Sequence, residues 1–104
     1  MTILDRAHFD HMTGADRALQ LEILELFRGQ VSGWRGAFAS GAGWREALHA
    51  MKGSARGIGF TQLAATCEAA EQADEAGRAE VLGQVEAALS EALVALEQFA
   101  ADAP

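Results

Sequence analysis

The sequence predicts an all-α domain, an antiparallel up-and-down four-helix bundle with a short N-terminal helix, and three observations support this prediction. Half of the 104 residues are hydrophobic and only one is proline. Apolar residues recur at the three- and four-residue spacing of amphipathic helices, with no alternation typical of strands. Short glycine-containing breaks separate these stretches, and helices joined by short loops pack as antiparallel neighbours. The length predicts a single domain over residues 1–104.

The N-terminal half is expected to contain two helices. Residues 3–12 should form a short leading helix that caps one end of the bundle, and Thr13 and Gly14 should end it. Asp16 is expected to cap a long second helix that runs to about residue 39, with Gly29 and Gly33 weakening its middle. A tight turn at residues 40–43 should follow. The predicted apolar stripe of this helix consists of Leu19, Ile23, Leu26, Phe27, Val31, Trp34 and Phe38.

Three further helices are expected in the second half of the chain. The first spans about residues 43–57, and the second spans about 61–75 with Thr61 as a possible cap. A turn near Gly77 leads to the third, about 78–101, and residues 97–104 should be frayed. The inward residues are predicted to be Trp44, Leu48, Met51, Ala55 and Ile58, then Leu63, Cys67 and Ala70, then Val81, Val85, Leu89, Ala92, Leu96 and Phe99.

Composition excludes several classes of function. A single cysteine rules out an internal disulfide framework and fits the reducing cytoplasm, where we expect the protein to act. No stretch approaches the roughly 20 apolar residues of a membrane span, and the first residues carry acids where a secretory signal has a basic start. The net charge of −7 argues against sequence-independent binding to nucleic acid.

One histidine stands apart from the apolar stripes. On a helix, His49 lies beside the stripe rather than on it, along the same flank as Arg45, Lys52 and Arg56. Gly53 follows on the next turn. A glycine inside a helix costs roughly 0.5–1 kcal/mol relative to alanine, so close approach of another molecule explains Gly53 better than helix formation does.

The residues from His49 onward resemble the signature of a known family. The run His49-Ala50-Met51-Lys52-Gly53-Ser54 is followed at fixed offsets by Gly59, Leu63, Cys67 and Glu71. This pattern resembles the histidine-containing phosphotransfer (HPt) domain family of bacterial phosphorelays. The strong match covers about a quarter of the chain. Ala70 stands where the family usually has a larger aliphatic residue, and Gly57 adds a second glycine; both departures concern packing.

The resemblance assigns roles around His49. It implies that His49 is the phosphoacceptor, a residue type that can form covalent intermediates. Lys52 is expected to pair with phosphoryl oxygens, and Gly53 to leave room for a partner's active site. If the chain turns near residues 58–60, Glu71 should come level with His49 and hold its Nδ1–H, leaving Nε2 as the nucleophile.

The roles of three other residues follow less directly. Ser54 either donates a hydrogen bond or is merely a small residue at a packed position. Arg45 and Arg56 are expected to be charges that face a partner rather than catalytic groups. A surface histidine and a solvated lysine remain the alternative interpretations of His49 and Lys52.

The predicted function is that of a phosphorelay carrier. The sequence offers no nucleotide site and no set of carboxylates for Mg²⁺, so the protein is expected not to be a kinase and to need no cofactor of its own. Its partners would be receiver domains of response regulators, which supply Mg²⁺ and the aspartate, and a sensor or hybrid histidine kinase. A monomer is expected. The alternative is a four-helix adaptor that docks to such partners without carrying phosphate.

Two other features of the sequence are not expected to be functional sites. His8 and His11, with Asp5 and Asp10 nearby, have no further ligand pair at matching spacing, so no metal site is predicted. Cys67 lies on an apolar stripe and is expected to be a small core residue.

Overall fold

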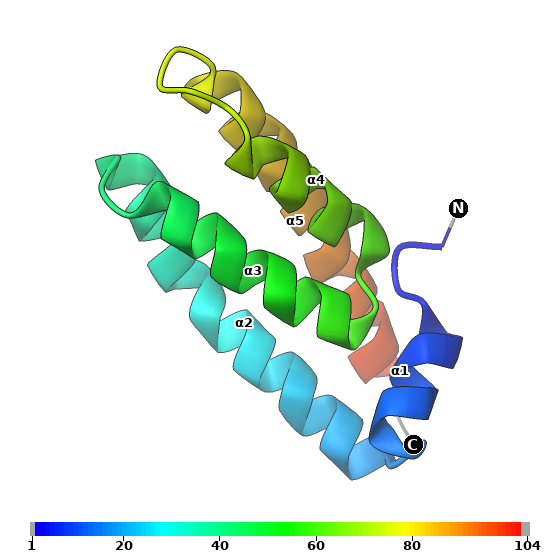
Figure 1. The fold of residues 1–104 in the computed structure, drawn as a ribbon. Coiled ribbons are helices and arrows are strands. Elements are labelled where there is room, and N and C mark those ends of the chain that lie inside the picture. The colour runs from blue at the N-terminus through cyan, green and yellow to red at the C-terminus, as the bar shows by residue number, and fades with distance from the viewer. Residues whose placement is uncertain (1, 103–104) are drawn as a thin grey trace.

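The computed structural model describes residues 2–102, which form five helices and contain no strand (Figure 1). The helices are α1 (Arg6–Thr13), α2 (Arg17–Ser40), α3 (Trp44–Ile58), α4 (Thr61–Glu71) and α5 (Arg78–Ala101). From α2 to α5 each helix runs back along the one before it, and α1 lies at the end where α2 begins and α5 finishes (Figure 1). The all-α prediction is confirmed. None of the described helices is both long and apolar enough to cross a membrane.

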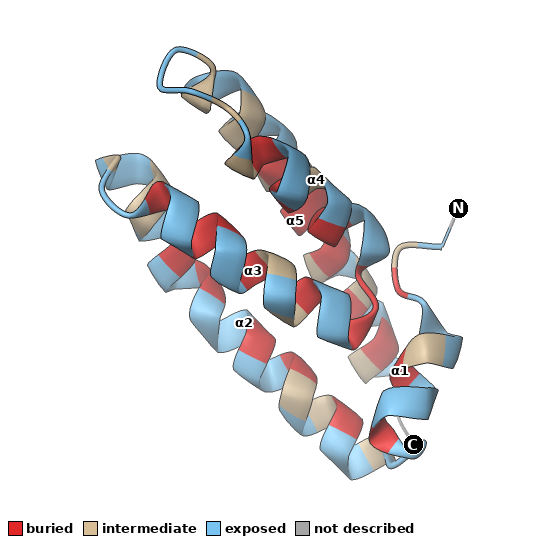
Figure 2. Cartoon of the chain, in the orientation of Figure 1, coloured by how far each residue is buried: buried red, intermediate tan, exposed pale blue. Residues whose placement is uncertain are grey.

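A single apolar core lies between these helices. Helix α3 packs against α1, α2 and α4, and α5 packs against α2 and α4. Figure 2 shows the buried residues on the faces that the helices turn toward one another. The predicted stripe of α3 is confirmed, and Leu48, Met51 and Ala55 are completely shielded from solvent. Shortening a buried leucine or methionine to alanine typically costs about 2–5 kcal/mol, so this face fixes the rotation of α3 about its axis.

Helix α2 begins as predicted, but its apolar stripe is narrower. The Asp16 side chain accepts a hydrogen bond from the Leu19 amide (3.1 Å), which confirms the predicted cap. The glycines within α2 do not interrupt it. Leu19 and Leu26 were predicted to face the core, yet both are exposed, Leu26 to 63%. Because α2 has its main neighbours in α3 and α5, only residues between those two helices are buried, and Leu26 lies outside that sector.

The turn between α3 and α4 departs from the prediction at its cap. Gly59 has φ 110°, and a Cβ there would lie 2.9 Å from the Asp5 carbonyl oxygen, so only glycine fits. Phe60 takes the N-cap position of α4. Its ring is fully buried, with its centroid 5.3 Å from that of Phe27. Burial of this aromatic ring sets the helix start, so the predicted cap, Thr61, is instead the first residue of α4.

One predicted helix end and part of the predicted fraying are wrong for identifiable reasons, although α5 ends at Ala101 as predicted. Helix α4 stops at Glu71 rather than near residue 75, because the Asp74 side chain accepts a hydrogen bond from the Gly77 amide (2.9 Å) and favours a turn there. Helix α5 continues to Ala101, so residues 97–101 are not frayed. Phe99 is buried there, and Arg17 lies over its ring at 4.0 Å while donating to its carbonyl oxygen (3.2 Å). Residues 103–104 of the predicted frayed tail lie outside the described residues.

Candidate functional site

His49 lies partway along α3, on the side that faces solvent. Its side chain is 74% exposed, while Leu48 immediately before it is completely buried. This contrast follows from helix geometry, since adjacent residues are rotated by about 100° and Leu48 is on the stripe that contacts the core. The imidazole is therefore held on a rigid helix and can be reached from outside.

Glu71, the last residue of α4, lies beside His49. The turn at Gly59 sends α4 back along α3, and Glu71 Oε2 lies 3.5 Å from His49 Nδ1. A turn near residues 58–60 predicts this proximity of Glu71 to His49. The other carboxylate oxygen, Oε1, lies 2.7 Å from Lys52 Nζ. One carboxylate thus faces an imidazole with one oxygen and an ammonium with the other.

The surroundings of Glu71 favour the ionised form of its carboxyl group. The bond from the Lys52 ammonium is the largest influence, and it lowers the pKa of Glu71 below its ordinary value of 4.5. Partial burial acts in the opposite direction, and the His49 ring adds to the lowering. Near neutral pH Glu71 is therefore a negatively charged acceptor for whatever proton His49 Nδ1 carries.

Lys52 is less accessible than its place on a charged flank predicts. Its side chain is only 14% exposed, and its amine meets Glu71 rather than open solvent. Arg45 and Arg56 are also directed toward the α4 side. Arg45 lies over the Trp44 ring at 4.3 Å and donates to the Ala73 carbonyl oxygen (2.6 Å), and Arg56 pairs with Glu68 at 3.3 Å. Each cation of this flank has a partner within the chain.

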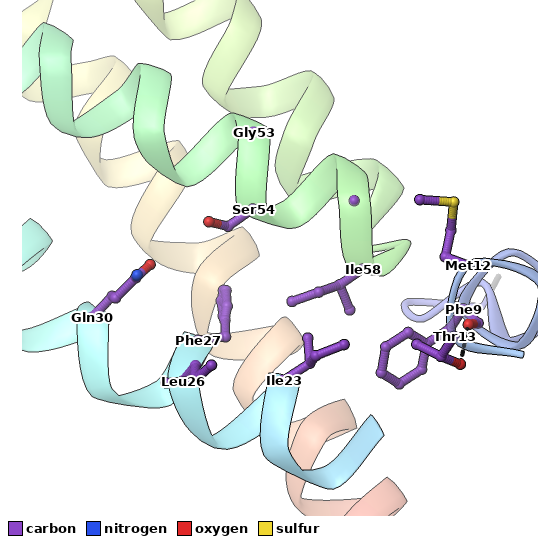
Figure 3. Close-up of a pocket in the computed structure, with 11 residues that line it drawn as sticks. Phe9, Met12, Thr13, Ile23, Leu26, Phe27, Gln30, Gly53, Ser54 and Ile58 are labelled. Carbon is purple, nitrogen blue, oxygen red and sulfur yellow. Dashed lines mark hydrogen bonds between the residues drawn. The ribbon is translucent and has the colours of Figure 1, made fainter. Parts of the chain in front are cut away.

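Gly53 and Ser54 lie on the other flank of α3, which faces α2. Between the two helices is a groove with a volume of about 300 Å³, which we call the α2–α3 groove (Figure 3). Its apolar lining consists of Phe9, Met12, Ile23, Leu26, Phe27 and Ile58. Ser54 points into it and lies about 140° around α3 from His49, so it is not part of the His49–Glu71 pair.

The α2–α3 groove is not predicted by the sequence patterns described above. A Cβ built on Gly53 would meet nothing within 4 Å, so this position is open and the space next to the groove is unfilled. One signal could have revealed it. The predicted apolar stripe of α2 is too wide for a helix with two main neighbours, and one of its two exposed leucines, Leu26, lines the groove.

The remaining histidines and the cysteine lie elsewhere. His8 Nε2 lies 3.2 Å from the Gly57 carbonyl oxygen and so links α1 to the end of α3. Within residues 2–102, no three His, Cys, Asp or Glu side chains gather into a possible metal site. Cys67 is buried, as predicted, and burial together with the Glu71 charge raises its pKa to about 12.

The surroundings of His49 do not fit a magnesium ion. Mg²⁺ takes near-octahedral oxygen ligands, usually including carboxylates. The carboxylate beside His49 is Glu71, whose two oxygens already face Lys52 and the His49 ring.

Comparison with known proteins decides the family. The family model described as the Hpt domain matches residues 10–99 of the chain. The protein belongs to the Hpt domain family. The crystal structure of the histidine phosphotransferase ShpA from Caulobacter crescentus is similar to this Hpt domain, with a TM-score of 0.80 and 33% sequence identity. The match covers 97% of this chain and 93% of that one. A search of curated proteins gives no significant match.

This result confirms the resemblance seen in the sequence. Hpt domains are phosphotransfer carriers rather than kinases, and the matched region of this Hpt domain contains His49, Lys52 and Glu71. The similarity extends over nearly the whole length of both chains. The likeness therefore lies in the whole helical scaffold and not only in the short motif around His49.

Proposed function

We propose that this Hpt domain accepts a phosphoryl group on Nε2 of His49 from a partner kinase or receiver domain and passes it to an aspartate of a response regulator. The observation that carries the proposal is the state of His49: an exposed imidazole whose Nδ1 faces an ionised carboxylate. The scaffold is an antiparallel four-helix bundle of α2–α5, with α1 as a short cap at one end.

The chemistry requires only a neutral imidazole and a fixed orientation. With its proton on Nδ1 and directed at Glu71, the ring has its lone pair on Nε2, on the side away from that carboxylate. Nε2 attacks the phosphorus of an aspartyl phosphate, the N–P bond forms, and the bond to the aspartate oxygen breaks with its electrons leaving on the carboxylate. Transfer onward is the reverse reaction. Phosphoryl transfer depends mainly on positioning and electrostatics, which the pair His49–Glu71 supplies.

A partner must come close to α3 for this reaction to occur. Gly53 leaves the backbone bare one turn from His49, and the α2–α3 groove beside it exposes apolar surface. We propose that a receiver domain covers this side of α3 and contributes both the aspartate and Mg²⁺. We also propose that the protein acts as a monomer in the cytoplasm.

The test is phosphate transfer from a phosphorylated receiver domain. The Hpt domain is mixed with receivers labelled by a small phosphodonor, and the product is examined by intact mass spectrometry before and after mild acid, which hydrolyses phosphohistidine. We expect one acid-labile phosphate in the wild-type protein and none in His49→Gln. If no receiver transfers phosphate yet receivers still bind, the protein is an adaptor and the proposal is wrong.

A further inference from the structure

The polar side chains of the α2–α3 groove differ in whether they have a partner within the chain. Thr13 donates to the Phe9 carbonyl oxygen (2.7 Å) and accepts from Gln20 (2.9 Å). Gln30 and Ser54 point into the groove at its end away from α1, and none of the described residues forms a hydrogen bond with either side chain (Figure 3). From this contrast we infer that Gln30 and Ser54 determine which receiver domains the Hpt domain accepts. The inference rests on the proposed function, because it concerns recognition of the same partner.

A receiver that reaches His49 also covers this end of the groove. Ser54 follows His49 by five residues, which is about 7.5 Å along the axis of α3, and Gln30 lies on the α2 wall of the same groove. An ordinary protein–protein interface buries about 800 Å² on each partner, which corresponds to a patch of roughly 16 Å radius. An interface of that size around His49 therefore includes both polar side chains.

Covering the groove removes water from these two polar groups. In the free protein Gln30 is exposed and Ser54 is half-buried, so water can satisfy the amide and the hydroxyl. A receiver without a hydrogen-bonding group at this place leaves both groups unpaired, and leaving a polar group buried and unpaired costs more than a formed hydrogen bond contributes. The two side chains therefore penalise a receiver that does not match them.

The rest of the groove has little power to discriminate between receivers. Its other side chains are apolar apart from Thr13, whose hydroxyl is already paired, and none of the described residues that line it is charged. An apolar surface accepts apolar groups of similar size almost equally, whereas a site that requires a hydrogen bond rejects partners that lack one. The exposed Met12 side chain, at the end of the groove next to α1, adds an adaptable contact. Selection among receivers therefore depends on Gln30 and Ser54.

The receiver surface that fits the groove has an apolar part and a polar part. An apolar side chain fills the space lined by Ile23, Leu26 and Ile58. Because a carboxamide and a hydroxyl each donate and accept, the group that faces Gln30 and Ser54 must also carry a donor and an acceptor, as a backbone peptide group or a side-chain amide does. A receiver with an apolar side chain in that place would fit by shape and still be rejected.

Transfer from a panel of phosphorylated receiver domains tests this inference. The second-order rate constant for each receiver is measured with the wild type, Gln30→Met, Ser54→Ala and the double variant. Methionine keeps the length and the helix propensity of glutamine, and alanine keeps the small size of serine. In the double variant we expect the rate for the preferred receiver to fall about 10-fold and the rates for the least preferred receivers to hold or rise. Equal changes for all receivers would overturn the inference. If circular dichroism shows that the double variant does not fold, the two single variants decide in the same way.

Gln98→Met is the matched control. Gln98 is also an exposed helical glutamine, but it lies on α5, which is not among the helices packed against α3. Its substitution should leave the ratio of rates between preferred and poor receivers as in the wild type. A change in that ratio as large as in Gln30→Met would contradict the inference.

Equilibrium binding of unphosphorylated receivers separates this inference from the proposed function. Titration calorimetry gives a dissociation constant for each receiver without any transfer. If no receiver transfers phosphate, yet the double variant narrows the spread of dissociation constants, the phosphocarrier role fails and the inference stands. If transfer is normal and the spread is the same in the double variant, the inference alone fails. If no receiver binds at all, both fail.

Discussion

The two flanks of α3 differ in how they are covered. On the flank toward α4, Lys52 and Arg56 reach across to acidic side chains, and Arg45 reaches the turn that follows that helix. On the flank toward α2, Gly53 has no side chain and the α2–α3 groove exposes apolar surface. His49 lies between the two, with its Nδ1 directed to the first flank.

This difference shows how one short helix serves two requirements. On the α4 flank the cationic side chains are paired within the chain, and the Glu71 carboxylate faces His49 Nδ1. This flank can therefore orient the imidazole before any partner binds. The α2 flank is left open, so it can be covered by a partner. Substitutions on each flank test that division.

Replacing His49 with glutamine should abolish phosphate acceptance completely, because the nucleophile is lost. The side chain is exposed and off the apolar stripe, so the free energy of unfolding should change by less than about 0.5 kcal/mol. Mass spectrometry after mixing with a phosphorylated receiver measures the first effect, and urea unfolding measures the second. His11→Gln is the matched control, since His11 is also an exposed helical histidine; it should label normally.

Gly53→Gln should separate partner access from folding. Nothing lies within 4 Å of the new Cβ, and glutamine favours helix over glycine by several tenths of a kcal/mol, so the domain should be as stable or more stable. A partner kept about 1 Å from its proper distance can lose about 100-fold in rate, which is the loss we expect for transfer.

Gly83→Gln on α5 is the control for this substitution. The position is equally open, and it lies on α5, which is not among the helices packed against α3, so the same gain in stability should leave transfer unchanged. If Gly53→Gln lowers stability and transfer together, Gly53 serves folding and the α2 flank is not a docking side.

Arg56→Glu should have a moderate effect on association. The Arg56–Glu68 pair is exposed on both sides, so its loss alone costs little, but reversal of charge next to His49 should slow binding of an acidic receiver about two- to five-fold, in line with roughly 1 kcal/mol or less. Stopped-flow transfer over a range of receiver concentrations separates affinity from the saturating rate.

Arg35→Glu is the control for the charge reversal. Arg35 also forms an exposed pair across two helices, with Glu86 of α5, and it lies away from His49. It should leave association unchanged. A fall in the saturating rate for Arg56→Glu, with affinity untouched, would place Arg56 in the chemical step and contradict its assignment.

The smallest expected effect is on how the free energy of unfolding depends on pH. Because the folded-state pKa of Glu71 is lowered from 4.5, ionised Glu71 adds stability above that value, and the contribution disappears as the pH falls from 4.5 through the lowered pKa. Urea unfolding at a series of pH values should show a shallower acid slope in Glu71→Gln than in the wild type. Equal slopes would mean that Lys52 and His49 do not stabilise the carboxylate.

The elements that the sequence predicts best are those with a strong helical period. The apolar face of α3, the Asp16 cap and the position of Glu71 beside His49 all follow from spacing and from one turn. The errors occur where local chemistry competes with that period. Asp74 ends α4 early through its own turn, and buried Phe60 displaces Thr61 as the first capping position.

The sequence predicted that Glu71 comes level with His49, but it did not predict how the cations near His49 pair. Helical spacing correctly places Arg45, Lys52 and Arg56 along one flank with His49, yet it cannot say whether a long cationic side chain faces solvent or a neighbouring helix. That choice depends on which acids α4 presents at the same level. Two of these acids are Glu68 and Glu71, and their pairing with Arg56 and Lys52 is a tertiary feature.

The contact between the N-terminal segment and the α3–α4 turn affects how Glu71 is placed relative to His49. The Asp5 amide donates to the Gly59 carbonyl oxygen (2.9 Å), and His8 lies against the Gly57 carbonyl oxygen. The position of Glu71 along α3 relative to His49 depends on that turn. Residues about 50 positions earlier in the chain therefore help to hold His49 and the Glu71 carboxylate at their spacing. Loss of these contacts would leave every side chain of the site present but would shift Glu71 relative to His49. A substitution far from the site could then prevent the histidine from accepting phosphate.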